Sequence, residues 1–310
     1  MKILLIGGTG TISSAITRQL ASAGHELWLI NRGNRNTDLP KSVNLVIGDI
    51  NKHPDETIAK LGNETFDAVC EFIGFLPEQV NRDIKVFSGR TRQYVFISSA
   101  SAYNKPVRQY VITEGTSLAN PYWEYSRNKI ACEELLMRAY RENDFPVTIV
   151  RPSHTYCERG VPVSIHGPKG SWQVLKRMME GKQVIVHGDG SSLWTLTWNQ
   201  IYKTIADTLG VEYKPYYVAS EYLAAIAPAS YDLEGNLLGD KAATVVFDCS
   251  KLKRAVPGFC ATTPFHEGVR RAVAYIKNHP VTQIEEPEFD LWCDRVIETL
   301  EQTKISFSHQ

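Results

Sequence analysis

A tyrosine and a lysine stand four residues apart in the stretch Tyr125-Ser-Arg-Asn-Lys129, inside a segment with helical character. Residues at i and i+4 share one face of a helix, so the hydroxyl and the ammonium can meet. A nearby ammonium favours phenolate over phenol, which suits a tyrosine that gives and takes a proton. The pair therefore predicts general acid/base chemistry by Tyr125. Taken alone, it is also typical of an exposed helix face.

Three serines, Ser98, Ser99 and Ser101, follow the apolar run "YVFI". Such a run predicts a buried strand of a parallel sheet, and ligands bind beyond the carboxyl ends of such strands. A serine hydroxyl at that place can orient a substrate oxygen while Tyr125 moves the proton. The serines and the tyrosine–lysine pair together predict an active site better than either does alone.

A glycine-rich turn, Gly7-Gly8-Thr9-Gly10, lies between the apolar run "KILLI" and the helical segment "SSAITRQLASAG". Between a strand and a helix, such glycines allow a tight turn and bring the backbone close to a pyrophosphate at the helix N-terminus. We therefore predict a dinucleotide site whose phosphates lie beside Gly7, Gly10, Thr11 and Ile12. The alternative is a plain glycine turn that binds no ligand.

The type of dinucleotide is indicated by the residues that follow the second predicted strand. NAD sites usually have Asp or Glu there to bind the ribose 2′-hydroxyl, whereas this chain has Asn31-Arg32-Gly-Asn-Arg35. A guanidinium suits a 2′-phosphate, so NADP is favoured and NAD remains possible. The alternative is that both arginines lie on a solvated loop. Asp49, followed by Ile50, ends the third strand, where it can accept a hydrogen bond from the adenine amine.

Apolar strands alternate with amphipathic helices up to Pro152. This order predicts an α/β fold, a Rossmann-type doubly wound parallel sheet, over residues 1–152. Residues 153–310 show shorter, mixed elements, and we expect them to form a smaller α/β substrate lobe that is interwoven with the first domain. Within that lobe, the stretch 231–243 is predicted to be a polar loop.

The composition excludes several classes of protein. The 310 residues carry 34 basic and 34 acidic side chains, so bulk charge favours neither nucleic acid nor an anionic membrane. No apolar run approaches the roughly 20 residues of a membrane helix. The six cysteines form no C-x-x-C pair, which argues against a metal site and suits reduced thiols in the cytoplasm.

The motifs "GGTGTIS", "GDI", "FISSASAY", "EYSRNK" and "VRPSHTY" resemble the extended short-chain dehydrogenase/reductase superfamily, in its NAD-dependent epimerase/dehydratase group. The resemblance is close in the first half of the chain and looser beyond. It implies a Ser99–Tyr125–Lys129 triad, with Lys129 also on the nicotinamide ribose. It further places Pro152 and Ser153 by the nicotinamide, and Phe72 and Ile73 along the adenine ribose and phosphates. A homodimer through the Tyr125 helix is a further expectation from the family.

This chain departs from that family in three places. Ser13 stands where the fingerprint has its third glycine, a mild change because serine is small. Trp194 stands where members that bind nucleotide sugars have an arginine for the diphosphate, which puts such a substrate in doubt. We also expect about one βα unit of the family to be absent near residue 197. We hypothesise that this shortening weakens the activity or the stability of the protein.

These observations predict an NAD(P)-dependent oxidoreductase, epimerase or dehydratase that transfers hydride at a carbinol or carbonyl carbon of a small, sugar-like substrate. The first alternative is a non-catalytic NAD(P)-binding sensor on the same fold. The intact Ser99–Tyr125–Lys129 set argues against a sensor, whereas the missing segment argues for one. The second alternative, an RNA-binding relative, is disfavoured by zero net charge and by the lack of a basic–aromatic stripe.

Overall fold

The computed structural model describes residues 1–36, 39–188, 192–193 and 196–308. The chain forms two compact units. Unit 1 comprises Met1–Ala102 and Glu124–Thr155, and unit 2 comprises Tyr103–Trp123 and Tyr156–Gln310. The division differs from the expected 1–152 and 153–310 in the placing of residues 103–123. These residues join the later chain because β6 (Val111–Ile112) pairs in parallel with β12 (Val246–Phe247).

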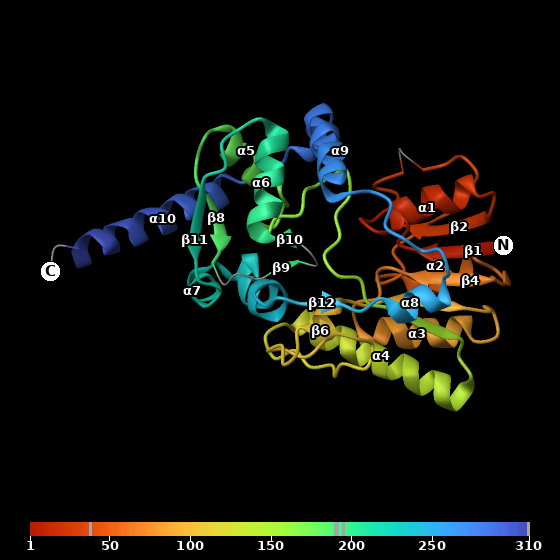
Figure 1. Cartoon of the computed structure of the whole chain (residues 1–310). Coiled ribbons are helices and arrows are strands. Elements are labelled where there is room, and N and C mark those ends of the chain that lie inside the picture. The colour runs from red at the N-terminus through yellow and green to blue at the C-terminus, as the bar shows by residue number, and fades with distance from the viewer. Residues whose placement is uncertain (37–38, 189–191, 194–195, 309–310) are drawn as a thin grey trace. The chain divides into compact units, whose positions relative to one another are not determined.

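Unit 1 is built on a six-stranded parallel sheet (Figure 1). Its order is β3-β2-β1-β4-β5-β7. The strands are β1 (Lys2–Ile6), β2 (Glu26–Asn31), β3 (Val43–Ile47), β4 (Ala68–Glu71), β5 (Tyr94–Ile97) and β7 (Val147–Val150). The chain winds outward from β1 in one direction and from β4 in the other, so the strand order reverses between β1 and β4. This is the doubly wound α/β fold that the sequence predicts, with its ligand crevice expected at that reversal.

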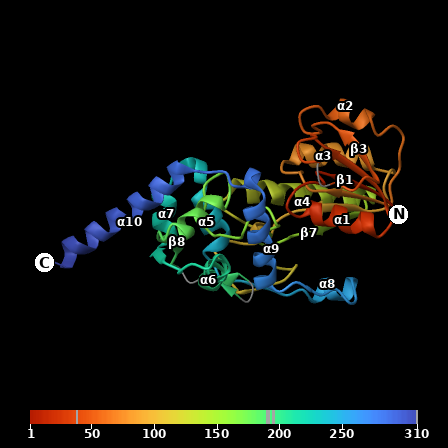
Figure 2. The same ribbon diagram turned by 90° about the horizontal axis from the view of Figure 1, so that it is seen from above.

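Helices cover both faces of this sheet. They are α1 (Ser13–Ser22), α2 (Pro54–Ala59), α3 (Pro77–Phe87) and α4 (Glu124–Asn143). Side chains alternate along a strand, so Leu5 packs toward α1 while Leu4 packs into the core shared with α3 and α4. Figure 2 shows α1 and α3 on opposite sides of the sheet. The strands are therefore buried on both faces, as their continuous apolar sequences indicate.

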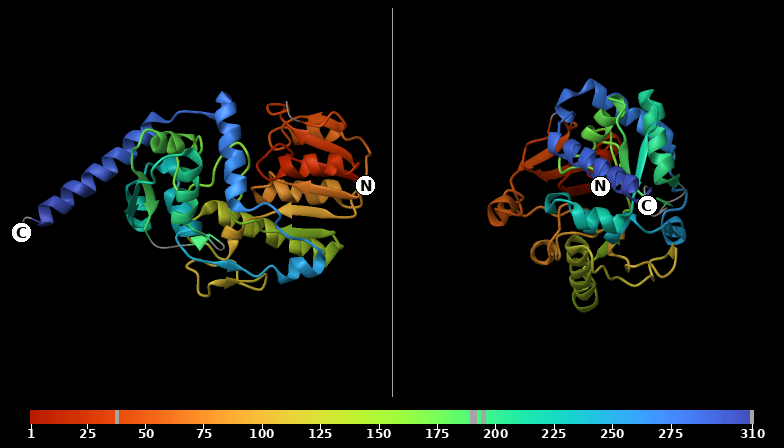
Figure 3. Two further views of the ribbon diagram at one scale, coloured as in Figure 1. Left: turned by 45° about the horizontal axis from the view of Figure 1, so that its top comes forward. Right: turned by 90° about the vertical axis from the view of Figure 1, so that its left-hand side faces the viewer.

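Unit 2 is a mixed α/β unit around a core of its own. Two parallel strands, β8 (Val184–His187) and β11 (Pro215–Val218), form its centre. The helices are α5 (Trp172–Met179), α6 (Trp198–Leu209), α7 (Ser220–Ile226), α8 (Ser250–Ala255), α9 (Phe265–Asn278) and α10 (Pro287–Ser308). The first half of α10 buries Phe289, Trp292 and Val296, and its second half extends to the C-terminal end (Figure 3). None of the described helices combines the length and apolar character that crossing a bilayer requires.

The prediction of a polar loop at 231–243 is wrong. Residues Glu234–Lys241 form a π-helix, η3. Leu233 and Leu237 are buried in the core of unit 2, since residues four apart lie on one side of a helical turn. The Asn120 side-chain amide also donates to the Gly239 carbonyl at 2.8 Å. Two leucines among polar residues anchor this segment, and the overall polarity of the stretch conceals them.

The region of the suspected shortening is compact. A short hairpin, β9 (Ser192–Leu193) and β10 (Leu196–Thr197), leads directly into α6. Thr197 caps α6 by accepting a hydrogen bond from the Gln200 amide, so no further βα unit lies between β10 and this helix. Among the described strands of the sheet β7 is an edge, and its Val150 is 41% exposed. Trp194, which the sequence singles out, lies outside the described residues.

Candidate active site

The glycine turn after β1 is held in a conformation that requires glycine. Gly7 has a φ of +88°, and its amide donates to the Ile30 carbonyl at 2.9 Å. A Cβ on Gly7 would lie 2.5 Å from Ile73, and one on Gly8 would lie 2.1 Å from Leu29. The turn is thus pressed against β2 and the loop after β4, and the backbone alone faces outward, as a phosphate-binding turn needs.

Ser13, at the position of the third glycine of the fingerprint, forms hydrogen bonds that a glycine could not form. Its side chain is buried. The hydroxyl donates to the Gly7 carbonyl at 2.6 Å and accepts from the Gly10 amide at 2.8 Å. The serine therefore ties the first turn of α1 to both predicted phosphate-binding glycines. Close packing against β2 falls to Gly8 instead. Thr11 is exposed and Ile12 half-buried at the start of the helix.

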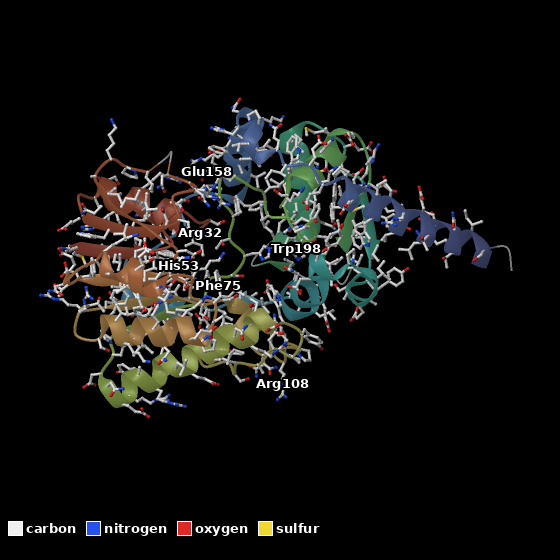
Figure 4. The ribbon with its side chains drawn as sticks, turned by 180° about the vertical axis from the view of Figure 1, so that it is seen from behind. Arg32, His53, Phe75, Arg108, Glu158 and Trp198 are labelled. Carbon is white, nitrogen blue, oxygen red and sulfur yellow. The ribbon has the colours of Figure 1, made fainter. Side chains whose placement is uncertain are left out.

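The loop after β2 is organised by the buried side chain of Asn31. Its Oδ1 accepts from the Gly33 amide at 2.8 Å, and its Nδ2 donates to Asn36 Oδ1 at 2.7 Å. Arg32 and Arg35 are exposed on this loop. Figure 4 shows Arg32 on the same edge of unit 1 as His53 and Phe75, where the parallel strands end. Asn31 thus shapes the loop, while the arginines remain accessible to an anion.

Asp49 shapes the loop after β3. Its Oδ1 accepts from the Asn51 and Lys52 amides at 3.1 and 3.2 Å. No described residue donates a hydrogen bond to the other carboxylate oxygen, which is thus available to a ligand. The Ile50 side chain is buried in the core, and its carbonyl accepts from Arg82. Ile50 therefore helps to fix this loop through its backbone carbonyl, while its side chain points into the core.

Lys129, the lysine of the predicted catalytic triad, is buried. Its ammonium donates to the Ile97 carbonyl at 2.7 Å and the Gly74 carbonyl at 2.8 Å. It also lies 5.8 Å from the centre of the Tyr125 ring. Burial lowers the pKa of Lys129 from its usual 10.5 to about 8. Among the described contacts, two of its three donors are used by carbonyls, which leaves one for a ligand.

Ser99 is joined to α4 by a chain of hydroxyl groups. Ser99 Oγ lies 2.8 Å from Ser101 Oγ, and Ser126 donates to Ser101 Oγ at 2.7 Å. Ser126 is the immediate neighbour of Tyr125. The end of β5 and the start of α4 are thus held together, which brings the predicted serine, tyrosine and lysine into one region of unit 1.

Glu133 is a buried residue of this region that the sequence analysis did not single out. It accepts from Ser98 Oγ at 2.5 Å, beside the predicted catalytic serine. It also accepts from Arg151 Nε at 2.9 Å and Nη2 at 2.5 Å. Glu133 stands four residues after Lys129, on the same face of α4. That i, i+4, i+8 spacing from Tyr125 is the signal that could have found it.

The two segments assigned to the cofactor by resemblance lie next to these groups. Pro152 follows Arg151, and its carbonyl accepts from the Ala100 amide at 2.9 Å, which places Ser153 beyond the end of β5. Phe72 extends β4 by donating its amide to the Ile6 carbonyl at 3.0 Å. Ile73 packs on Gly7. The residues predicted to bind the cofactor therefore follow the carboxyl edge of the sheet in unit 1.

The donor set at this edge fits a dinucleotide. A glycine backbone that approaches closely, a helix N-terminus, accessible arginines and a buried lysine with a remaining donor match phosphates and ribose hydroxyls. Among the described residues, no group of three or more His, Cys, Asp and Glu side chains is arranged to hold a metal ion.

Known proteins are similar to this chain in sequence or in fold. The chain is 23% identical over 291 residues to 2'-dehydrokanamycin reductase from Streptomyces kanamyceticus, covering 84% of this chain and 80% of that protein. It is 29% identical over 174 residues to UDP-glucose 4-epimerase from Lactobacillus helveticus, covering 49% and 51%. The fold is similar to that of UDP-glucuronic acid 4-epimerase from Bacillus cereus in complex with NAD, with a TM-score of 0.67, 15% identity, and coverage of 90% and 97%.

One protein-family model matches the part of the chain that contains these motifs. The description of that family is NAD dependent epimerase/dehydratase, and its match extends over residues 3–198. That range contains the glycine turn, the serine strand and the tyrosine–lysine helix. The chain therefore belongs to the NAD dependent epimerase/dehydratase family, and it is an NAD(P)-dependent enzyme of the hydride-transfer type.

Proposed function

We propose that this enzyme oxidises or reduces a carbinol or carbonyl carbon with Ser99, Tyr125 and Lys129 as its catalytic residues. The observation that carries the proposal is the buried Lys129 ammonium beside the Tyr125 ring, anchored to the strand that ends at the serines. Burying an ammonium group costs free energy unless the group is paired or hydrogen-bonded, and buried ionisable groups of this kind cluster at functional sites.

The nicotinamide ring, when bound, supplies the hydride donor or acceptor. Tyr125 donates a proton to the substrate oxygen during reduction and accepts it during oxidation. Ser99 orients that oxygen by a hydrogen bond. Lys129 stabilises the phenolate of Tyr125 electrostatically, and its remaining donor binds a ribose hydroxyl. Gly7, Gly10, Thr11 and Ile12 line the phosphates.

We further propose that NADP is preferred over NAD. The loop after β2 offers Arg32 and Arg35 and lacks the carboxylate that binds a ribose 2′-hydroxyl. Both arginines are exposed, so a 2′-phosphate reaches them without a conformational cost inside the core. Arg32→Ala should weaken NADP binding about tenfold and leave NAD binding unchanged.

The substrate that we propose is a small, sugar-like molecule. The similar proteins include a reductase of dehydrokanamycin and an epimerase of UDP-glucose. A tryptophan at position 194, where an arginine would grip a diphosphate, favours a substrate without a nucleoside diphosphate. Trp194 is outside the described residues, so this argument rests on the sequence alone.

Calorimetric titration of the purified protein with NADP, and separately with NAD, tests the proposal. A denatured sample is first checked for co-purified nucleotide. Tighter binding of NADP supports the role of Arg32 and a reductase. Preference for NAD, or NAD already bound, contradicts the role of Arg32 and favours an epimerase or dehydratase that recycles its cofactor. Binding of neither nucleotide contradicts both the enzyme and the sensor.

We also propose a homodimer formed through α4, on the resemblance to the family. Tyr140 of this helix is 52% exposed, and tyrosine is enriched at protein–protein interfaces, which supports the proposal. Light scattering coupled to size exclusion measures the mass directly. A monomeric mass at micromolar concentration contradicts the dimer.

A cytoplasmic location is proposed from the cysteines. All six are free, and three of them, Cys70, Cys157 and Cys249, are half-buried. Free thiols persist in reducing compartments. Cell fractionation tests the proposal, and recovery from an oxidising compartment contradicts it.

A further inference from the structure

A half-buried arginine of α3, Arg82, connects two loops of unit 1 that carry predicted cofactor residues. Arg82 Nη1 donates to the Ile50 carbonyl at 2.8 Å and to Asn51 Oδ1 at 2.9 Å. The same guanidinium binds Asp83 through Nε at 2.8 Å and Nη2 at 2.7 Å. Arg82 thus fixes the loop after β3 to the helix that follows β4.

Asn51 extends this connection to the next loop. Its side-chain amide donates to the Ile73 carbonyl at 3.2 Å. The Ile73 amide in turn donates to Glu71 Oε1 at 2.5 Å. Since Ile73 also packs on Gly7, Asn51 links the loop after β3, the loop after β4 and the glycine turn.

The network includes two fully buried carboxyl groups, Glu71, which binds the Ile73 amide, and Asp83, which binds Arg82. Tyr94 donates to Asp83 Oδ2 at 2.7 Å, and Arg82 neutralises the same carboxylate. Burial, and next the charge of Asp83, hold the pKa of Glu71 well above its usual range. The surroundings therefore favour the neutral, protonated form of Glu71.

Structural demands alone do not account for this arrangement. A buried ion pair contributes little net stability compared with apolar residues of similar volume. Arg82 nevertheless directs two of its hydrogen bonds to loop residues next to Asp49, and Asn51 directs its amide to the loop of Phe72 and Ile73. Arg82 Nη1 and the Asn51 side-chain amide thus both end on segments that would flank the adenosine half of the cofactor.

We propose that Arg82 and Asn51 are positioning residues that set the separation of the two loops flanking the adenosine half of the bound dinucleotide. This inference rests on the proposed function, because it concerns the same site. The two residues act through backbone and loop geometry and need no contact with the ligand. Their loss should therefore weaken binding of adenosine-containing ligands and spare the nicotinamide half.

Two variants test the proposal, with Arg90→Lys as the control. Asn51→Asp keeps the acceptor for Arg82 and removes the donor to Ile73. Arg82→Lys keeps the charge that faces Asp83 and loses the planar fork. Arg90 also binds backbone carbonyls, those of Gly62 and Glu64 at 2.8 to 3.1 Å, but it lies before β5, at the amino end of the strands.

The readout is calorimetric affinity for adenosine 2′,5′-bisphosphate and for nicotinamide mononucleotide, with circular dichroism to confirm folding. We expect about a tenfold loss for the adenosine ligand in Asn51→Asp and Arg82→Lys, as the loss of one hydrogen bond that fixes the loop implies. The mononucleotide affinity and the control should remain at wild-type values. Unchanged adenosine affinity in a folded Asn51→Asp variant overturns the proposal, as does an equal loss for both ligands. A wild-type protein that binds neither NAD nor NADP removes the proposed function and this inference together.

Discussion

The Lys129 ammonium donates to the Ile97 carbonyl at 2.7 Å, so the helix that carries Tyr125 is bonded to β5, the strand that immediately precedes Ser98 and Ser99. The lysine is therefore both a catalytic candidate and a structural link between α4 and β5. Its second bond, to the Gly74 carbonyl, adds the loop after β4. One side chain thus joins the three segments on which the predicted catalysis depends.

Tyr125→Phe should lower turnover by about 10²- to 10⁴-fold, because the variant lacks the proton that general acid catalysis transfers. Affinity for NADP should stay at its wild-type value, since the ring and Lys129 remain. Steady-state kinetics and calorimetry measure the two quantities. Tyr110→Phe, at an exposed tyrosine outside α4, is the control. Full turnover by Tyr125→Phe contradicts the mechanism.

Glu133→Gln should destabilise the folded protein by about 3 kcal/mol, because Arg151 loses a buried, bidentate carboxylate partner. The substitution should also displace Ser98 and Pro152. This displacement should lower kcat more than it changes the substrate KM. Urea unfolding and steady-state kinetics measure these effects. Glu134→Gln changes the exposed neighbour on α4 and should behave as wild type. Equal effects of the two substitutions would count against the positioning role of Glu133.

Lys241 predicts a pH-dependent contribution to stability. Burial lowers the pKa of Lys241 from its usual 10.5 to about 8. Between pH 8 and 10.5 the unfolded chain thus binds more protons than the folded one, so stability gains from this residue as pH rises. Relative to Lys241→Met, the wild-type free energy of unfolding should rise with a slope of up to about 1.4 kcal/mol per pH unit.

Urea unfolding at pH 7, 8.5 and 9.5 measures this difference. The buried thiols of Cys132 and Cys293, whose pKa values burial raises to about 12, act in the opposite direction above pH 9. They are present in both proteins, so their effect cancels. Lys203→Met, at an exposed position of α6, should differ from wild type by a constant amount. A constant difference for Lys241→Met would show that Lys241 is not desolvated.

Thermal unfolding should show a single transition that NADP raises. The chain passes between the units after Ala102, Trp123 and Thr155, so neither unit is one continuous segment and the two should unfold together. NADP at a hundred times its Kd should add about 2.7 kcal/mol of stability. Two separate transitions contradict the coupling. A low midpoint without a response to NADP would support the hypothesis that the shortening near residue 197 weakens the protein.

The sequence by itself determined the fold class and the local chemistry of the candidate site. Gly7 and Gly10 predict a tight turn because they lie between a predicted strand and a predicted helix that are adjacent in the sequence. Tyr125 and Lys129 share a helix face because that spacing is a property of any helix. Each of these features depends on residues close together in the chain, which is why they could be predicted.

Only the tertiary structure decided which distant residues support that chemistry. Glu133 meets Ser98 and Arg151, and Arg82 meets Ile50 and Asn51, across sequence separations that no local pattern encodes. Leu237 is buried in the core of unit 2 although the stretch around it is mostly polar, and Asn120 of the distant segment 103–123 binds the Gly239 carbonyl two residues further on. Buried polar networks require partners with fixed geometry, and that geometry exists only after the strands have paired and the helices have packed.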